Sequence, residues 1–239
     1  MAITLANLGV SAAPDLNDNV DRTSYATASW TPPTSGLILV GIWSRNAAGP
    51  NTPTVSGNGI TWTEVLSQLH ATVLRYTLFA ALAAGSSAGA TTFDFAGQTQ
   101  LLGIATFFHA DGVDLSGGVA GAIVQSVAAT HISTNSAPTV TLAAAGHADN
   151  RPILIAGVDS NTTPTPRANW TEVDVLAGTT PNHTIESQFR TDAFETTAGV
   201  TWAVSGNGIL IAAELKADQG GAPAAEPPPA NPWYSYAQQ

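Results

Sequence analysis

The sequence predicts an all-β protein, folded as a two-sheet antiparallel sandwich from two similar halves and followed by an extended C-terminal arm. Short runs of β-branched and aromatic residues lie between clusters of Gly, Pro, Asn and Thr, at the spacing of strands. The 3.6-residue period of amphipathic helices is scarce in the chain. Several runs also recur in the same order in the second half, which indicates an internal duplication.

The predicted strands of the first half span residues 37–44, 62–69, 73–80, 91–95 and 101–109. In the third run Leu74, Tyr76 and Leu78 share one face, as the two-residue period of a strand requires. The first and last runs are almost continuously apolar. We therefore expect them to be central strands, covered on both faces.

The duplication rests on four matched segments. Residues 37–46 match 152–161, and the tetrapeptide WTEV occurs at both 62–65 and 170–173. Residues 74–77 find a counterpart in 185–190, and 101–111 in 208–218. Two units with the same strand sequence predict two similar multi-strand structures.

Each predicted unit has four or five strands, and a sheet of that size has an apolar face that it cannot bury alone. Face-to-face packing of the units gives about eight to ten strands in a jelly-roll-like sandwich. Two tandem immunoglobulin-like sandwiches are the alternative. Residues 111–149 are no short linker, because they hold further predicted strands at 122–127 and 140–144. We expect one domain over residues 1–217, with pseudo-repeats at about 24–114 and 122–217.

Charge is sparse and acidic. The 239 residues carry 7 Lys and Arg against 17 Asp and Glu, a net charge of −10, and charged residues make up 10% of the chain, against roughly 25% in typical domains. Nucleic acid is therefore not an expected partner, since phosphate binding needs clustered cations. Zero Cys excludes disulfides and thiolate sites. The start resembles no secretory signal and no apolar run is long enough to span a bilayer, so we expect no membrane association.

Residues 218–239 form the predicted arm. Glycines open it, a triple proline favours an extended polyproline conformation, and aromatic residues follow. Bulky rings beyond a stiff spacer are suited to filling a groove on a neighbouring subunit or protein, whereas the alternative is a frayed terminus. The candidate partner-binding residues are Pro227, Pro228, Pro229, Trp233, Tyr234 and Tyr236.

One segment has the alternating oxygen side chains of a calcium loop: Asp15, Asn17, Asn19 and Asp21. It is no EF-hand, and a solvated turn capped by Asn and Asp explains the same residues. The five histidines, which lack the close spacing of zinc ligands, are His70, His109, His131, His147 and His183. No cofactor is predicted.

No catalytic motif is present. Glu64 and Glu172 occupy matched positions and would resemble a glycosidase pair if both faced one cleft, but pseudo-symmetry equally predicts opposite edges. Trp62 and Trp170 are also matched, which favours packing in a core over a sugar-binding platform. The pentapeptide SGNGI at 56–60 and at 205–209 predicts Asn-Gly turns.

Four motifs resemble β-sandwich virion proteins of tailed phages and prophages, such as capsid decoration, head-fibre and tail-associated proteins. They are GITWTEV at 59–65 (degenerate at 167–173), RYTL at 75–78, ADGVD at 110–114 and VQSVA at 124–128. The resemblance implies a structural, non-enzymatic role with no catalytic residues. In the second half Arg167 replaces the turn glycine of the motif.

We therefore expect a virion protein, assembled in the host cytoplasm, that packs against the major capsid protein or another virion component. Few charges leave broad neutral faces for contact with copies of the chain, so a homo-oligomer is expected, with a trimer as the best estimate. The alternative is a carbohydrate-binding or adhesin-like module with a glycan ligand.

Overall fold

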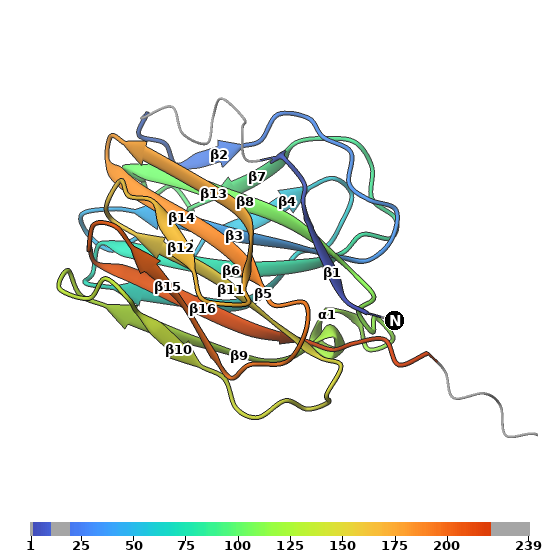
Figure 1. Ribbon diagram of the computed structural model, residues 1–239. Coiled ribbons are helices and arrows are strands. Elements are labelled where there is room, and N and C mark those ends of the chain that lie inside the picture. Colours follow the sequence, from blue (N-terminus) through green and yellow to red (C-terminus); the bar gives the residue numbers. More distant parts are fainter. Residues whose placement is uncertain (1, 11–19, 221–239) are drawn as a thin grey trace, which may run out of the picture.

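The structure, a computed structural model, describes residues 2–10 and 20–220, in which sixteen strands and one short helix form two repeats (Figure 1). The first repeat contains β1 (Thr4–Asn7), β2 (Ser24–Ala26), β3 (Leu37–Arg45), β4 (Thr54–Gly57), β5 (Thr63–His70), β6 (Leu74–Leu82), β7 (Thr91–Asp94) and β8 (Leu102–Asp111). After α1 (Gly118–Ala122), the second contains β9 (Ile123–His131), β10 (Thr139–Thr141), β11 (Arg151–Val158), β12 (Pro164–Pro166), β13 (Thr171–Thr179), β14 (Asn182–Phe189), β15 (Thr197–Trp202) and β16 (Gly208–Leu215).

Both repeats have the same topology. The first forms a five-stranded sheet, β1-β8-β3-β6-β5, and a three-stranded sheet, β2-β7-β4. The second forms β9-β16-β11-β14-β13 and β10-β15-β12, the same orders with each strand eight places later. All pairs of neighbouring strands are antiparallel, and each repeat alone has the eight strands of a jelly-roll-like unit.

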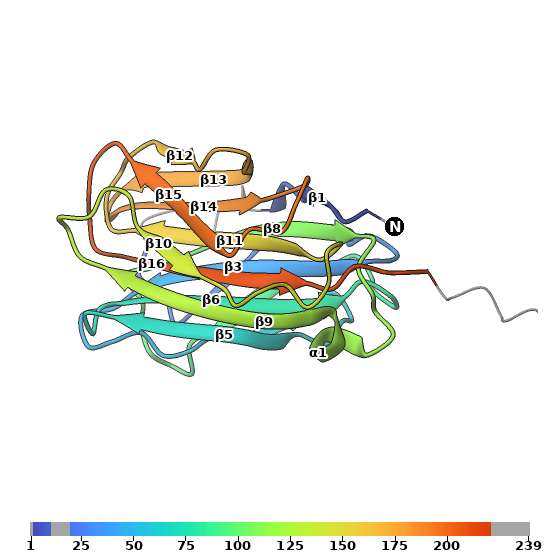
Figure 2. The ribbon, with the colours of Figure 1, turned by 60° about the horizontal axis from the view of Figure 1, so that its bottom comes forward.

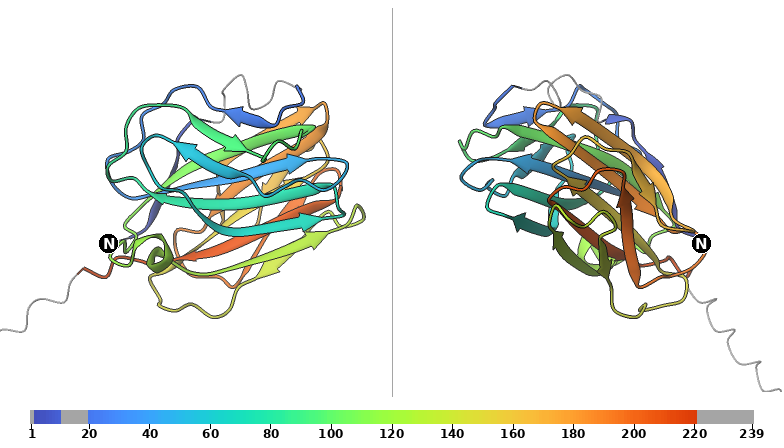
Figure 3. Two further views of the ribbon diagram at one scale, coloured as in Figure 1. Left: turned by 180° about the vertical axis from the view of Figure 1, so that it is seen from behind. Right: turned by 60° about the vertical axis from the view of Figure 1, so that its left-hand side comes forward.

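The two five-stranded sheets pack face to face, and the buried central core lies between them (Figure 3). Leu39, Trp43 and Tyr76 enter it from the first repeat, and Ile155 and Ile211 from the second. A smaller outer core separates each large sheet from its own three-stranded sheet. The predicted sandwich is confirmed, and the outer sheets raise the strand number beyond the eight to ten expected.

Side-chain alternation along the strands follows the prediction in the first repeat. Leu74, Tyr76 and Leu78 of β6 face the central core, while Phe79 faces the outer core. Strands β3 and β8 are buried over nearly their whole length and lie inside the sheet, as expected. The two-residue period thus places every second residue of β6 in the central core.

The alignment of 37–46 with 152–161 pairs the correct strands, β3 and β11, but is one residue out of register. It pairs Leu39 with Leu154, yet Leu39 faces the central core and Leu154 the outer core. The central-core residues of β11 are Ile153 and Ile155. Because the side-chain period of a strand is two, a slip of one residue exchanges the faces.

The WTEV segments correspond closely in structure. Each begins an edge strand, and each is followed by a register shift at the same place, between Glu64 and Leu66 in β5 and between Glu172 and Asp174 in β13. Such bulges bend an edge strand and increase its twist. The duplicated sequence therefore encodes a β-bulge at the same place in both repeats, as well as the same strands.

Candidate functional site

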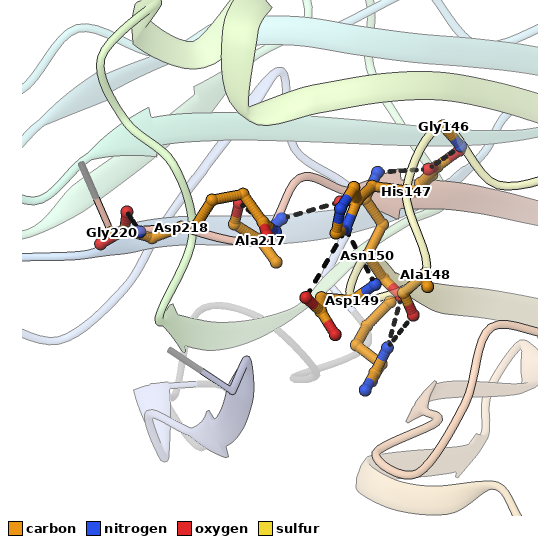
Figure 4. A network of polar contacts seen from close by, with 11 residues as sticks. Gly146, His147, Ala148, Asp149, Asn150, Ala217, Asp218 and Gly220 are labelled. Atoms are coloured by element: carbon orange, nitrogen blue, oxygen red, sulfur yellow. Dashed lines mark hydrogen bonds and ion pairs between the residues drawn. The ribbon is translucent and has the colours of Figure 1, made fainter. Parts of the chain in front are cut away.

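The end of the second repeat is fixed to the segment that joins the repeats. The Asp114 amide donates to Lys216 O, and the Asp218 amide to Gly112 O. Lys216 Nζ lies 2.8 Å from Asp114 Oδ2. The hydrogen bonds of Asp114 with Lys216 and then with Ser116 hold the pKa of Asp114 well below its usual range. These contacts fix the last described residues, and the Gly220 amide donates to Asp218 Oδ1 (Figure 4).

A buried carboxylate, Glu214, organises the loop beside this exit. Its Oε1 accepts from the Gly146 amide at 2.8 Å and from Asn150 Nδ2 at 2.5 Å, while Oε2 accepts from Gln125 Nε2. Asn150 Oδ1 in turn accepts from the Ala217 amide at 3.0 Å (Figure 4). The network ties the loop 142–150 to both β9 and the last residues of the body.

Next to the exit, three adjoining hollows form what we call the α1 trough. The first, of about 260 Å³, lies between β5, α1 and the start of β9, which are neighbours at one edge of the sandwich (Figure 2). It shares Thr63, Val119 and Ala120 with a second hollow of about 460 Å³ that extends to residues 59–61. It shares Val124 with a third, of about 280 Å³, which reaches Gln219.

The first hollow of the α1 trough is mostly apolar. It is lined by Val65, Val119, Ala120, Ile123 and Val124, besides polar residues of β5 and β9. The Val124 side chain stays 45% exposed, which is unusual for a valine in a strand. Two edge strands meet here, and edge strands have backbone groups without a partner in their own sheet. These properties are typical of a contact surface.

The opposite edge has a matching but separate hollow. It measures about 330 Å³ and lies between β1 and β13, with Leu5, Glu172 and Phe189 among its lining residues. Glu64 lines the first hollow of the α1 trough, at the other edge of the sandwich. The two glutamates are therefore on opposite edges and form no carboxylate pair. This is the arrangement expected from the pseudo-symmetry of the two repeats.

The body tryptophans pack into cores. Trp43 and Trp202 are 0% and 2% exposed, and Trp170 6%. Trp62 packs on the outer core of the first repeat, 6.3 Å from the ring of Phe107, and Trp170 lies in the outer core of the second. The packing interpretation of the matched pair is confirmed.

The calcium candidates Asp15, Asn17 and Asn19 lie outside the described residues, whereas Asp21 is an exposed residue before β2. Across residues 2–10 and 20–220, no three His, Asp or Glu side chains gather as metal ligands would. His109 and His183 contact the carbonyl oxygens of Ser35 and Pro181, at 2.7 Å and 2.8 Å. The arm residues Pro227, Pro228, Pro229, Trp233, Tyr234 and Tyr236 also lie outside the described part.

Sequence reasoning missed a buried acid in β14. Glu186 and Gln188 are both 0% exposed and lie on one face of the strand, with Gln188 Nε2 donating to Glu186 Oε1 at 2.8 Å. The other oxygens, Glu186 Oε2 and Gln188 Oε1, are buried without a hydrogen-bond partner. Burial raises the pKa of Glu186 to about 8, and the charge of Glu172 adds to the shift.

Comparisons of the chain with family models, with curated proteins and with solved structures find no match. In the described part of the chain, no helix has the length and hydrophobicity needed to cross a membrane.

Proposed function

We propose that the chain is a non-enzymatic structural protein of a phage particle, a capsid decoration or other accessory virion protein that packs against the shell and against copies of itself. The observation that carries the proposal is the low density of charge, because Lys, Arg, Asp and Glu make up only 10% of the residues. Five of the seven cations interact within the body through side-chain hydrogen bonds or ion pairs, namely Arg75, Arg151, Arg167, Arg190 and Lys216. Neutral faces lose little solvation energy when they pack against a neighbour.

The α1 trough and the arm support the same proposal. A mostly apolar hollow with an exposed valine lies near the last described residues, after which the sequence continues with a proline- and aromatic-rich segment. Apolar concave surfaces and aromatic anchors are the usual central elements of protein contacts. The expected assembly is a closed homo-oligomer, with a trimer as the best estimate, in contact with the major capsid protein or another virion component.

Purified particles from the native source test the proposal. We expect mass spectrometry to find the protein in the virion in stoichiometric amount, and electron microscopy to find ordered copies on the particle. A chain present in infected cells but missing from intact, purified particles would contradict it.

A glycan-binding role is the alternative, and the packing of the body tryptophans weakens it. Trp43, Trp170 and Trp202 are buried, so none of the three offers a ring face to a sugar. A glycan array with the free protein tests this role. Sugar binding by a monomer, together with absence from particles, would replace the virion proposal.

A further inference from the structure

The α1 trough has one end at the root of the arm. Gln219, one of the last described residues, lines the third hollow, which shares the lining residue Val124 with the first. Two hydrogen bonds hold the residues just before the arm. The Asp218 amide donates to Gly112 O, and the Ala217 amide donates to Asn150 Oδ1. In every copy of the chain, the residue that precedes the arm therefore lies at the end of the trough.

The chemistry of the arm fits the trough. Residues 221–239 contain Trp233, Tyr234 and Tyr236 but a single charge, Glu226. The trough offers Val65, Ile123 and Val124 to such rings. An aromatic ring buries a large apolar area, and its polar tip can stay in contact with solvent at the open side.

The length and stiffness of the arm decide which trough it fills. From Gly221 to Trp233 there are 12 residue steps, which reach about 37 Å in a polyproline conformation. For comparison with the size of the body, β8 has 10 residues and extends over about 33 Å at ~3.3 Å per residue, which is less than the reach of the arm. Its own trough begins at Gln219, so an arm extended over this length would carry Trp233 beyond that trough.

We propose that the aromatic residues of one copy's arm dock in the α1 trough of a second copy. The inference rests on the proposed function, because it names a second copy of this chain as the neighbour. Trp233 would cover the exposed Val124, and the triple proline would span the distance between the two bodies. Linked in this way, each copy donates one arm and receives another.

Spin-label NMR on the full chain tests the proposal. Since the chain has no Cys, Ser235→Cys places a nitroxide among the aromatic residues with no competing thiol. Spin-labelled protein without ¹⁵N is mixed with ¹⁵N-labelled protein of natural sequence. We expect concentration-dependent broadening of the amides of Val65, Ala120 and Val124, because the label of one copy then lies near the trough of another.

Matched variants of the ¹⁵N-labelled copy control for non-specific contact. Val124→Asp places a carboxylate in the trough and should weaken the association about tenfold or more. Val175→Asp makes the same change at a 36% exposed valine on the opposite edge strand, β13, and should leave the association unchanged. Circular dichroism of both variants verifies that they fold.

Two results would overturn the proposal. One is broadening only when the label and ¹⁵N are in the same molecule, which would place the arm in its own trough. The other is no broadening at the trough up to millimolar concentration, or equal broadening with Val124→Asp and with natural sequence. Because free protein is used, these results are independent of whether the protein is found in particles.

Discussion

The side chains of Glu186 and Gln188 can satisfy each other's hydrogen-bonding groups only when the carboxyl group of Glu186 is protonated. A protonated Glu186 can donate to Gln188 Oε1 while its Oε1 accepts from Gln188 Nε2, so the two orphaned oxygens partner each other. The ionised form leaves both oxygens as acceptors and places a charge in the sheet interior. The raised pKa of Glu186, about 8, is the titration signature of this arrangement.

Stability should therefore depend on pH through Glu186. With a folded pKa of about 8 and an ordinary value of 4.5, the contribution is complete below pH 4.5 and is lost as pH rises from 4.5 to 8. We expect Glu186→Gln to raise the free energy of unfolding at pH 8 by about 4 kcal/mol and to flatten this dependence. Urea unfolding from pH 5 to 8 measures it, with Glu64→Gln as control, because Glu64 is exposed and does not contribute to the pKa shift of Glu186. Parallel pH curves for Glu186→Gln and natural sequence would contradict the assignment.

His131 acts in the opposite direction. It is 5% exposed, and burial, followed by the charge of His70, lowers its pKa below 6.5, while Asp159 and backbone hydrogen bonds with Gly206 and Ile132 oppose the shift. Its contribution is complete above pH 6.5 and is lost as pH falls below that value. His131→Gln should make the free energy of unfolding fall less between pH 6.5 and 5. The exposed His147→Gln should not change the slope, and an unchanged slope for His131→Gln would refute a neutral, buried His131.

At this scale the sequence predicted little. The strand assignment of β14 could be made from alternation alone, but alternation places polar Glu186 and Gln188 on a face that a soluble sheet would expose. Only the outer sheet, whose strands are three to six residues long, buries that face. Glu186 could therefore not be identified as a buried acid without knowledge of the outer sheet.

At the scale of elements, a glycine of one large sheet packs directly against a tryptophan of the other. A Cβ at Gly157 of β11 would lie 2.4 Å from Trp43 Cε3, and the Trp43 ring is itself buried against Tyr76 at 5.5 Å. The absence of a side chain at Gly157 is what leaves room for the indole of Trp43 between the repeats. The fit depends on residues 114 apart, which no local pattern encodes.

Gly157→Ala should therefore destabilise the protein by about 2–4 kcal/mol through overpacking. Gly121→Ala is the control, because a Cβ there meets nothing within 4 Å. Thermal unfolding of both variants measures the difference. Equal melting temperatures would mean that Trp43 has free space to move into.

Element prediction succeeded for the long, apolar strands and, among the short ones, only for β7 and β10. Strands β1, β2, β4, β12 and β15 were not predicted; four of them span only three or four residues. The repeated SGNGI shows the same limit. At 56–60 it turns, with Asn58 at φ 57°, and the Asn58 side chain donates to three carbonyl oxygens. At 205–209 it runs extended, because Asn207 pairs with Asp159 instead.

At the scale of the whole molecule, the two repeats share their largest core. Residues of β3, β6 and β8 meet those of β11, β14 and β16 in one cluster. The duplication in the sequence made this face-to-face arrangement predictable. The α1 trough was not predictable. It lies between a glycine-rich helix and two edge strands from different repeats, and no sequence motif indicates that these elements are neighbours. The domain boundaries stay a prediction.

Neither repeat should fold alone. Cleavage at a protease site inserted between Ser116 and Gly117 should leave the fragments associated and unfolding in one transition, since separation would expose the central core. Each isolated fragment should lose its near-ultraviolet circular dichroism. Release of two stable, separately folded halves would contradict a single domain over residues 1–217.

The shared core also has a consequence in time. Ribosomes add about 5–20 residues per second, and the second repeat extends from Ile123 to Leu215, 93 residues. During synthesis, the central face of the first repeat therefore stays exposed for roughly 5–20 s before the second repeat can pack on it. This face contains Leu39, Trp43 and Tyr76. Because an uncovered apolar sheet aggregates, translation speed and chaperone supply should limit the yield of this protein more than its final stability does.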